Sequence, residues 1–266
     1  MITRDRLRVL ARSLGVRLDY AEKNYVNSWL LWGLFTHSYG ANLLFKGGTA
    51  LSKLYFPASW RFSEDLDFGV DGAFQGSEAG LRNILDAISE RSGITFTIRE
   101  HYEAQQADYP THYVDCSIRY EAVLDGANTT SLDIMVDEYL AFESVLHTHA
   151  YEDVPQFELA AYSVEEIFAE KLRALYQRGI ARDYYDLYQL IQTDTVTIDA
   201  AAVRPAFEAK CNHDDLAVDL REGLPVARRG EIRNQWETDL LDLTTSSPPF
   251  DEAQTTIEDY IEQLLD

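Results

Sequence analysis

Hydrophobic residues recur along the first 160 positions with two different spacings, which separate strands from helices. A repeat of two is typical of strands with one buried face, whereas a repeat of three to four is typical of amphipathic helices. The helix predicted at 19–38 opens with Asp19 and Glu22 at capping-box spacing. Strands are predicted at 43–45, 66–70, 94–99, 113–120 and 132–136, and helices at 19–38, 49–55 and 77–91. This part of the chain therefore predicts a sheet with flanking helices.

The pattern changes after Pro155, where helical spacing takes over. Ser163 and Glu166 have capping-box spacing at the start of a helix that runs to about Arg178, and Gly179 ends it. Further helices are predicted at 182–191, within 199–220, at 228–243 and at 251–265. No repeat and no low-complexity linker separates the two parts. We therefore expect an α+β protein with a sheet domain at 1–160 packed against a helical domain at 161–266.

The charge balance limits the partners that such a protein can have. The 266 residues include 23 Lys or Arg and 45 Asp or Glu, which gives a net charge of −22, and Arg supplies most of the positive charge. Two explanations stay open: solubility through net repulsion, or a surface adapted to a very salty cytoplasm, which the scarcity of lysine favours. Either one argues against a broadly basic nucleic-acid surface, so a nucleic acid would have to be held by local cations.

No segment indicates export or membrane insertion. No apolar run approaches the roughly 20 residues that a membrane helix needs, and the N-terminal MITRDRLRVLARSLG lacks the apolar core of a signal peptide. Cys116 and Cys211 are too few for a disulfide framework. We therefore expect a cytoplasmic protein without membrane contact. His147 and His149 are expected in a surface loop, because no carboxylate stands at metal-ligand spacing around them.

The first chemical signal is an Asp-x-Asp pair in the strand at 66–70. Successive side chains alternate along a strand, so Asp65 and Asp67 share one face while Leu66 and Phe68 point into the core. Asp133 holds the equivalent position in the strand at 132–136. Three converging carboxylates would repel one another without a cation, which suggests a site for a hard metal ion. The alternative is that the pair is only the polar face of an edge strand in an acidic chain.

The second signal is a glycine pair between a strand and a short helix. Gly47 and Gly48 lack side chains, so their amides could approach a phosphate closely, together with the Thr49 hydroxyl and the preceding Lys46. The spacing matches neither the P-loop nor the dinucleotide-binding fingerprint. What favours a phosphate site is the order of the elements: a glycine turn, an Asp-x-Asp strand and then a lone strand aspartate.

The third signal is EKLRALYQRGIARDYYDLYQL, at 170–190. Lys171 and Arg178 are seven residues apart on one helix and so share nearly the same face, and Arg182, Asp183 and Asp186 begin the next helix. This is a local basic patch on an acidic chain. The alternative is an exposed, salt-bridged helical hairpin with a leucine core.

Together, KGGTALSKLY, RFSEDLDF, SLDIMVDE and EKLRALYQRGIARDYYDLYQL resemble the AbiEii/AbiGii-type nucleotidyltransferases, the toxin components of abortive-infection, type IV toxin–antitoxin systems. The resemblance covers about residues 43–190. It implies a polymerase-β-like nucleotidyltransferase fold, a mixed sheet with flanking helices and an α-helical C-terminal part that completes the active site. It also implies Mg²⁺-dependent transfer of an NMP from an NTP.

The motifs and this resemblance together assign the site residues. In the family pattern, the glycine turn binds phosphate, the Asp-x-Asp pair binds metal, the helix lysine meets the triphosphate, and the R-D-x-x-D aspartate is needed for activity. The assigned groups are the catalytic Asp65, Asp67, Lys171 and Asp183; the phosphate-binding Lys46, Gly47, Gly48, Thr49, Arg178 and Arg182; and the Mg²⁺ ligands Asp65, Asp67 and Asp133.

The acceptor of the nucleotide stays open at this point. The resemblance to tRNA-modifying toxins suggests the 3′ end of an RNA, and a protein hydroxyl or a small hydroxylated molecule are alternatives. A domain that binds a nucleotide without transferring it is another, although such a binder has no need for three mutually repelling acids. A toxin of this kind also implies a cognate antitoxin.

Overall fold

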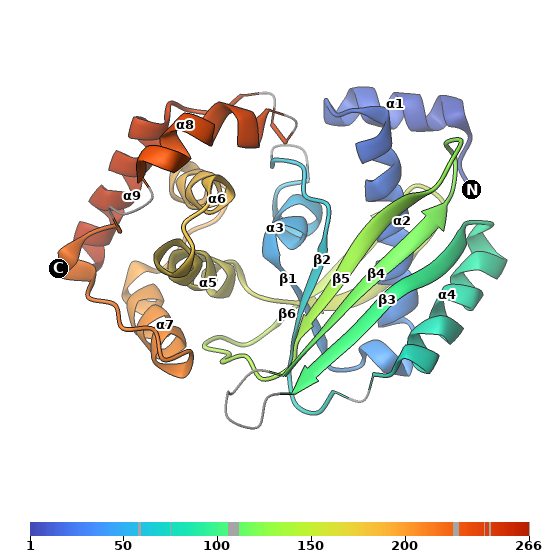
Figure 1. Cartoon of the computed structure of the whole chain (residues 1–266), viewed down its shortest axis with the longest axis horizontal. Helices are drawn as coiled ribbons and strands as arrows, with labels where there is room; N and C mark the ends of the chain where they lie inside the picture. Colours follow the sequence, from blue (N-terminus) through green and yellow to red (C-terminus); the bar gives the residue numbers. More distant parts are fainter. Residues whose placement is uncertain are drawn as a thin grey trace. The chain divides into compact units, whose positions relative to one another are not determined.

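The computed structural model describes residues 1–57, 60–74, 76–105, 112–225, 229–241, 243–244 and 246–265. The chain forms two compact units (Figure 1). The first holds residues 1–138 and 144–161, and the second holds residues 139–143 and 162–266. Residues 139–143, called the excursion below, thus belong to the second unit although the chain before and after them belongs to the first.

Within the described residues, the first unit is built on a mixed sheet of seven strands in the order β3-β4-β5-β2-β1-β7-β6. β1 is antiparallel to β2 and parallel to β7, and β2 is parallel to β5. The strands are β1 (Leu43–Lys46), β2 (Leu66–Val70), β3 (Thr95–Gln105), β4 (His112–Glu121), β5 (Asn128–Met135), β6 (Val145–Tyr151) and β7 (Val154–Ala161).

Helices cover the apolar face of this sheet. α2 (Leu18–Phe35) and α4 (Glu78–Ser92) lie beside each other there (Figure 1). A side chain at Gly33 of α2 would come within 2.5 Å of Ile88, so this glycine permits their close packing. Phe68 contacts Phe45 and Phe35 in the core between sheet and helix. The remaining helical segments are α1 (Arg4–Leu14), the 3₁₀ turn η1 (Ser38–Gly40), α3 (Gly47–Ala50) and the π-helical turn η2 (Leu51–Tyr55).

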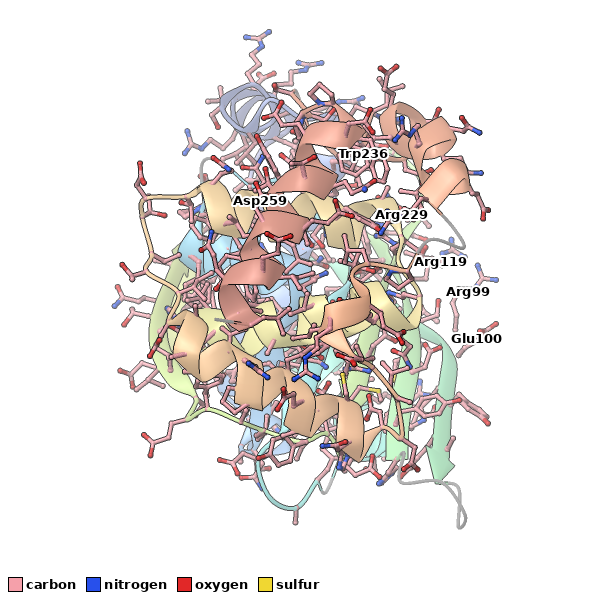
Figure 2. The ribbon with its side chains drawn as sticks, turned by 90° about the vertical axis from the view of Figure 1, so that its left-hand side faces the viewer. Arg99, Glu100, Arg119, Arg229, Trp236 and Asp259 are labelled. Carbon is pink, nitrogen blue, oxygen red and sulfur yellow. The ribbon has the colours of Figure 1, made fainter. Side chains whose placement is uncertain are left out.

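The second unit is helical where the structure describes it. Aromatic contacts join its helices: Tyr184 of α6 and Trp236 of α8 both pack against Phe250, at the start of α9. The Trp236 indole also donates a hydrogen bond to the carbonyl of Pro248 (2.8 Å). Figure 2 labels Trp236 among the side chains of this unit. The elements are α5 (Val164–Gln177), α6 (Ala181–Gln192), α7 (Ala200–His213), the 3₁₀ turn η3 (Leu220–Glu222), α8 (Arg229–Leu240) and α9 (Phe250–Leu265).

A buried ion pair fixes the excursion at 139–143 to the helices of the second unit. Lys210 Nζ lies 2.5 Å from Glu166 Oε1, with the two side chains 2% and 1% exposed, and donates to the Tyr139 carbonyl. The other oxygen of Glu166 accepts hydrogen bonds from the backbone amides of Ala141 and Phe142. Both charges are therefore compensated inside the protein.

The fold class predicted from the sequence is confirmed: a mixed sheet with flanking helices and an α-helical C-terminal part. Two local predictions were wrong. Asp19 and Glu22 form no capping box, since Arg17 is the N-cap of α2 and Glu22 instead accepts a hydrogen bond from the Leu124 amide. His147 and His149 lie in strand β6 rather than in a loop, and His149 is buried.

Two further strands and one helix were not foreseen. β6 and β7 extend the sheet beyond β1, and α1 precedes α2. The predicted helix at 228–243 is present as α8, although Arg228 and Asp242 lie outside the described residues. Among the described helices, none is long and apolar enough to cross a membrane.

Removing one partner of the buried pair should destabilise the protein strongly. Lys210→Met leaves the Glu166 carboxylate buried without its cation, and we expect a loss of about 3 kcal/mol in the free energy of unfolding. Urea denaturation followed by circular dichroism measures it. The control, Arg204→Gln, breaks an exposed pair with Glu208 and should cost less than about 1 kcal/mol. Adding Glu166→Gln to Lys210→Met should restore most of the lost stability. Equal losses of stability in Lys210→Met and in the control Arg204→Gln would contradict the interpretation.

Candidate active site

Four charged residues form one row across the sheet of the first unit. The strand register pairs Lys46 of β1 with Asp67 of β2, Asp67 with Asp133 of β5, and Asp133 with Asp115 of β4. Residues paired in this way share a face of the sheet. That face is opposite the buried Leu66 and its neighbours, so the sequence correctly separated the acids from the core.

Asp65 lies two residues before Asp67 and is held by two hydroxyl groups. Ser131 of β5 donates a hydrogen bond to Asp65 Oδ1 (2.6 Å), and Thr49 donates one to the Asp65 carbonyl oxygen (2.6 Å). Thr49 is 1% exposed. In this structure its hydroxyl therefore holds the glycine turn against the Asp-x-Asp segment, a role that the sequence did not predict.

The glycine pair is enclosed by three side chains. Gly47 has φ +74°, which favours glycine, and a Cβ there would lie 2.5 Å from Asp67 Oδ2. A Cβ at Gly48 would lie 2.8 Å from an Nη of Arg61 and 3.0 Å from Ser63 Oγ. Sequence reasoning did not assign Arg61 or Ser63 to the site. Their signal was their place in RFSEDLDF, directly before the Asp-x-Asp pair.

Within the row, Asp133 has a strongly raised pKa. Its partial burial, and then the negative charges of Asp67, Asp115 and Asp65, raise the pKa of its carboxyl to about 7, while Lys46 acts in the opposite direction. Lys46 is itself buried and forms a 2.5 Å salt bridge with Glu138. Lys46 thus serves as a counter-ion within the unit, next to the acids and the turn.

The donor set suits a hard divalent cation only in part before substrate binds. Among the described residues, no three His, Cys, Asp or Glu side chains are arranged as a ready metal site. Mg²⁺ commonly takes one or two protein carboxylates and completes its shell with water and substrate phosphates. Asp67 on β2 and Asp65 directly before it fit that pattern, and burial together with their negative charges raises the pKa of Asp133 beside them.

The predicted residues of the second unit form a compact charge network. Lys171 Nζ lies 2.9 Å from Asp186 Oδ2 and 3.5 Å from Asp183 Oδ1. The Arg178 guanidinium donates two hydrogen bonds to Asp183, at 3.0 and 3.1 Å. Both aspartates are 0% exposed, whereas Lys171 is 13% and Arg178 54% exposed. The buried acids therefore hold two cations whose ends reach the surface.

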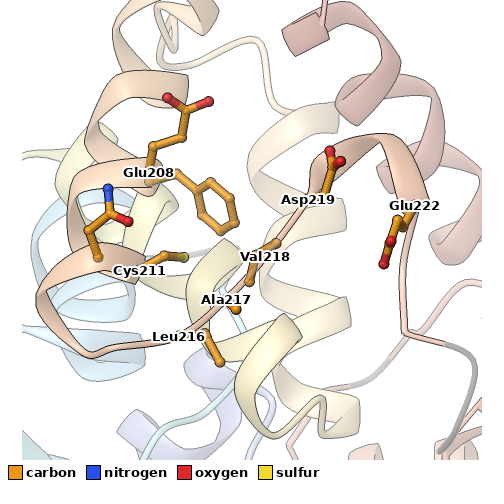
Figure 3. Close-up of a pocket in the computed structure, with 9 residues that line it drawn as sticks. Glu208, Cys211, Leu216, Ala217, Val218, Asp219 and Glu222 are labelled. Atoms are coloured by element: carbon orange, nitrogen blue, oxygen red, sulfur yellow. The ribbon is translucent and has the colours of Figure 1, made fainter.

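Arg182 completes the basic patch that the sequence predicted. It is exposed at the start of α6, one turn after Arg178 and directly before Asp183. The structure thus brings together Lys171, Arg178, Asp183 and Asp186 in one unit, and Lys46, the glycine turn, Asp65, Asp67 and Asp133 in the other. A separate hollow of about 560 Å³ in the second unit contains none of these residues (Figure 3).

Comparisons with known proteins agree with these features. A family model described as nucleotidyl transferase AbiEii toxin, type IV TA system, matches residues 29–256. Among solved structures, MenT4, a nucleotidyltransferase toxin from Mycobacterium tuberculosis, is similar over 100% of this chain and 90% of its own, with a TM-score of 0.68 and 21% identity. At that identity the likeness shows the fold alone. No curated protein matches the sequence.

The raised pKa of Asp133 predicts a pH-dependent stability. The pKa of Asp133 is about 7 in the folded protein and about 3.9 in the unfolded chain, so the folded state holds the proton more tightly. The contribution of Asp133 to the stability of the fold therefore falls as the pH rises from about 4 to about 7. In chelator, Asp133→Asn should therefore stabilise the protein above pH 7, by on the order of 1–2 kcal/mol after allowance for solvent screening. Thermal unfolding at pH 5 and pH 8 measures it.

The control for this prediction is Asp86→Asn, which removes an exposed acid on α4. It should leave the difference between the two pH values unchanged. A Tm difference between Asp133→Asn and the wild type that does not grow from pH 5 to pH 8 would contradict the assignment.

Proposed function

The chain belongs to the AbiEii family, the nucleotidyltransferase toxins of type IV toxin–antitoxin systems, and on this premise we propose that it transfers an NMP from an NTP to the 3′-terminal hydroxyl of a tRNA or another RNA. The observation that carries the proposal is the row of acids on one sheet face beside the glycine turn. We place the reaction in the cytoplasm, under the control of a cognate antitoxin.

The reaction is a substitution at the α-phosphorus. A bond forms between the acceptor oxygen and this phosphorus, the bond to the β-phosphate oxygen breaks, and pyrophosphate leaves in line. The protein contributes by positioning the two reactants and by neutralising charge. Backbone amides of Gly47 and Gly48 would bind the β- and γ-phosphates at the start of α3.

Asp65 and Asp67 would hold Mg²⁺, with Asp133 as the third ligand. The support is the donor chemistry: carboxylates on one face of the sheet, where burial and then the neighbouring negative charges raise the pKa of Asp133. When bound, Mg²⁺ supplies positive charge that offsets the triphosphate and the departing pyrophosphate. The residues around the acids keep them in place, through the Ser131 hydroxyl on Asp65 and the glycine at position 47 beside Asp67.

In the second unit, Lys171 and Arg178 would neutralise the triphosphate. Asp183 has no exposed surface and binds both cations, so we assign it a positioning role instead of direct contact with the acceptor. Asp186 shares that role through Lys171. The helical unit would in this way complete the active site.

Replacing one metal carboxylate should abolish transfer. We expect α-labelled NTP to label total tRNA in the presence of Mg²⁺ with the wild type, and Asp67→Asn to lower the rate at least 100-fold, because a lost electrostatic contact in the transition state costs about 3 kcal/mol or more. Each of the four NTPs is tested, at low and at multimolar salt. Asp86→Asn, on the opposite face of the sheet, is the control and should retain activity.

The possible outcomes separate the alternatives. Nucleotide binding without label on RNA or release of pyrophosphate would indicate a domain that only binds. Pyrophosphate released without labelled RNA would move the search to protein or small-molecule acceptors. Label on RNA with both wild type and Asp67→Asn would reject the metal assignment.

The positioning role of Asp183 predicts a specific kinetic change. Asp183→Asn weakens the bonds that hold Lys171 and Arg178, so the KM for the NTP should rise about 10- to 100-fold, as expected for charged hydrogen bonds worth about 1.5–3 kcal/mol. The KM for RNA should stay constant, and Lys171→Met should behave in the same way. Steady-state kinetics of a variant shown to be folded by circular dichroism tests this. A rise in the KM for RNA alone would instead indicate that Asp183 orients the acceptor.

A further inference from the structure

Positive charge is concentrated at the beginning of this acidic chain. Five of the 23 basic residues lie within the first 17 positions, where Asp5 is the only acid. All five are arginines with exposed side chains: Arg4, Arg6, Arg8, Arg12 and Arg17. The first four lie on α1, which precedes the range that the family model matches.

Three of these arginines form a stripe along α1. Arg4, Arg8 and Arg12 follow one another at four-residue spacing, which places them on one side of the helix with a rise of about 6 Å between neighbours. Leu7 and Ala11 are buried in a small core with Ala21 of α2, so the helix is held in place. The stripe is therefore a row of cations on a fixed support.

The present partners of the stripe are weakly held. Arg4 pairs with Asp125 at 3.1 Å and Arg8 with Asp5 at 2.7 Å, but the two aspartates are 96% and 88% exposed. Exposed ion pairs of this kind contribute little, and a phosphate, which accepts two hydrogen bonds from a guanidinium, can replace them. Arg6 differs, since it makes a two-bond contact with the mostly buried Glu152 and serves the fold.

A stack of side chains links the start of α2 with the glycine turn inside the first unit. The Arg17 guanidinium lies 5.3 Å from the centre of the Tyr20 ring, and that ring stacks on Phe62 at 4.5 Å. Phe62 directly follows Arg61, which lies against Gly48. A small hollow next to this stack is lined by residues of the α1–α2 connection and by Arg61 and Phe62. Arg17, which follows α1 in the chain, is thus connected through these rings with the site of the proposed chemistry.

We propose that the arginine stripe of α1 (Arg4, Arg8 and Arg12), continued by Arg17 on Tyr20, is the docking surface for the phosphate backbone of the acceptor RNA. A regular row of guanidinium groups matches a chain with regularly spaced phosphates, and arginine and aromatic side chains together are suited to single-stranded RNA. The remainder of the chain is strongly acidic and repels RNA, so the contact has to be local. This inference rests on the proposed function for the identity of the acceptor.

The test removes the stripe and compares it with arginines elsewhere. The variant is Arg4→Gln/Arg8→Gln/Arg12→Gln. The matched control is Arg82→Gln/Arg91→Gln/Arg204→Gln, which removes the same charge from two exposed positions on α4 and a partly exposed one on α7. Filter binding of tRNA and steady-state transfer are measured between 50 mM and 1 M salt. We expect the stripe variant to weaken tRNA binding and raise the KM for RNA at least tenfold at low salt, with an unchanged KM for the NTP.

The salt dependence gives a second readout. Each lost phosphate contact should reduce the slope of log K against log salt by about 0.7–0.9, so three contacts predict a reduction of about 2–3 in the stripe variant. The control should keep the wild-type slope. Equal effects of the two triple variants on RNA binding would overturn the proposal.

Binding and transfer separate this inference from the proposed function. If the wild type binds tRNA through the stripe but labels no RNA, the proposed reaction fails and the docking surface stands. If the stripe variant binds tRNA as the wild type does but no longer binds polyglutamate, which the wild type binds, the surface serves an acidic polypeptide and the RNA proposal is overturned.

Discussion

Repulsion between like charges along one row of the sheet is the constraint on which the candidate site depends. The register sets Asp67, Asp133 and Asp115 on neighbouring strands, and such strands lie only about 4.8 Å apart. The protein relieves the crowding in two ways: Lys46 ends the row, and the carboxyl of Asp133 has a pKa raised to about 7. Such an arrangement destabilises the folded protein by itself, which is typical of a site kept for binding.

The same constraint explains why the glycine turn has its particular composition. The turn lies so close to the acids that no Cβ fits at Gly47 beside Asp67, and Arg61 occupies the space beside Gly48. Thr49 ties the turn to the backbone of Asp65. The glycines therefore permit close packing against Asp67 and Arg61, and the proposed phosphate contact would use the same lack of side chains.

The sequence predicted most of the fold, and the failures have physical causes. β2 was predicted to the residue because Leu66 and Phe68 alternate with polar positions in a buried strand. β6 was missed because Val145 and Leu146 are exposed at the sheet edge and break the alternation. Glu22 resembled a capping residue, but its carboxylate accepts a hydrogen bond from the backbone amide of Leu124, more than 100 positions away.

In the site, contacts between residues far apart in the sequence could not be predicted from local sequence patterns. The Lys46–Glu138 pair depends on where β5 ends relative to β1, and the position of Arg61 against Gly48 depends on the path of the intervening loop. By contrast, Lys171, Arg178 and Asp183 lie on α5, at its C-cap and on the first turn of α6, so a short stretch of sequence already holds all three. Local periodicity therefore predicts a site within a hairpin better than one assembled across a sheet.

The use of lysine shows how this acidic protein separates its structural cations from those on its surface. Lys23, Lys46, Lys171 and Lys210 pair with Glu64, Glu138, Asp186 and Glu166, and the Lys53 ammonium donates to the Asn24 carbonyl and the Ser28 hydroxyl. None of the five lysine side chains is fully exposed. The positive charge offered to solvent is therefore arginine, whose planar, weakly hydrated group binds phosphate through two directed hydrogen bonds. Because salt shortens the range of simple charge attraction to a few ångströms, such direct contacts are the form of RNA recognition that an acidic surface in a salty solution can retain.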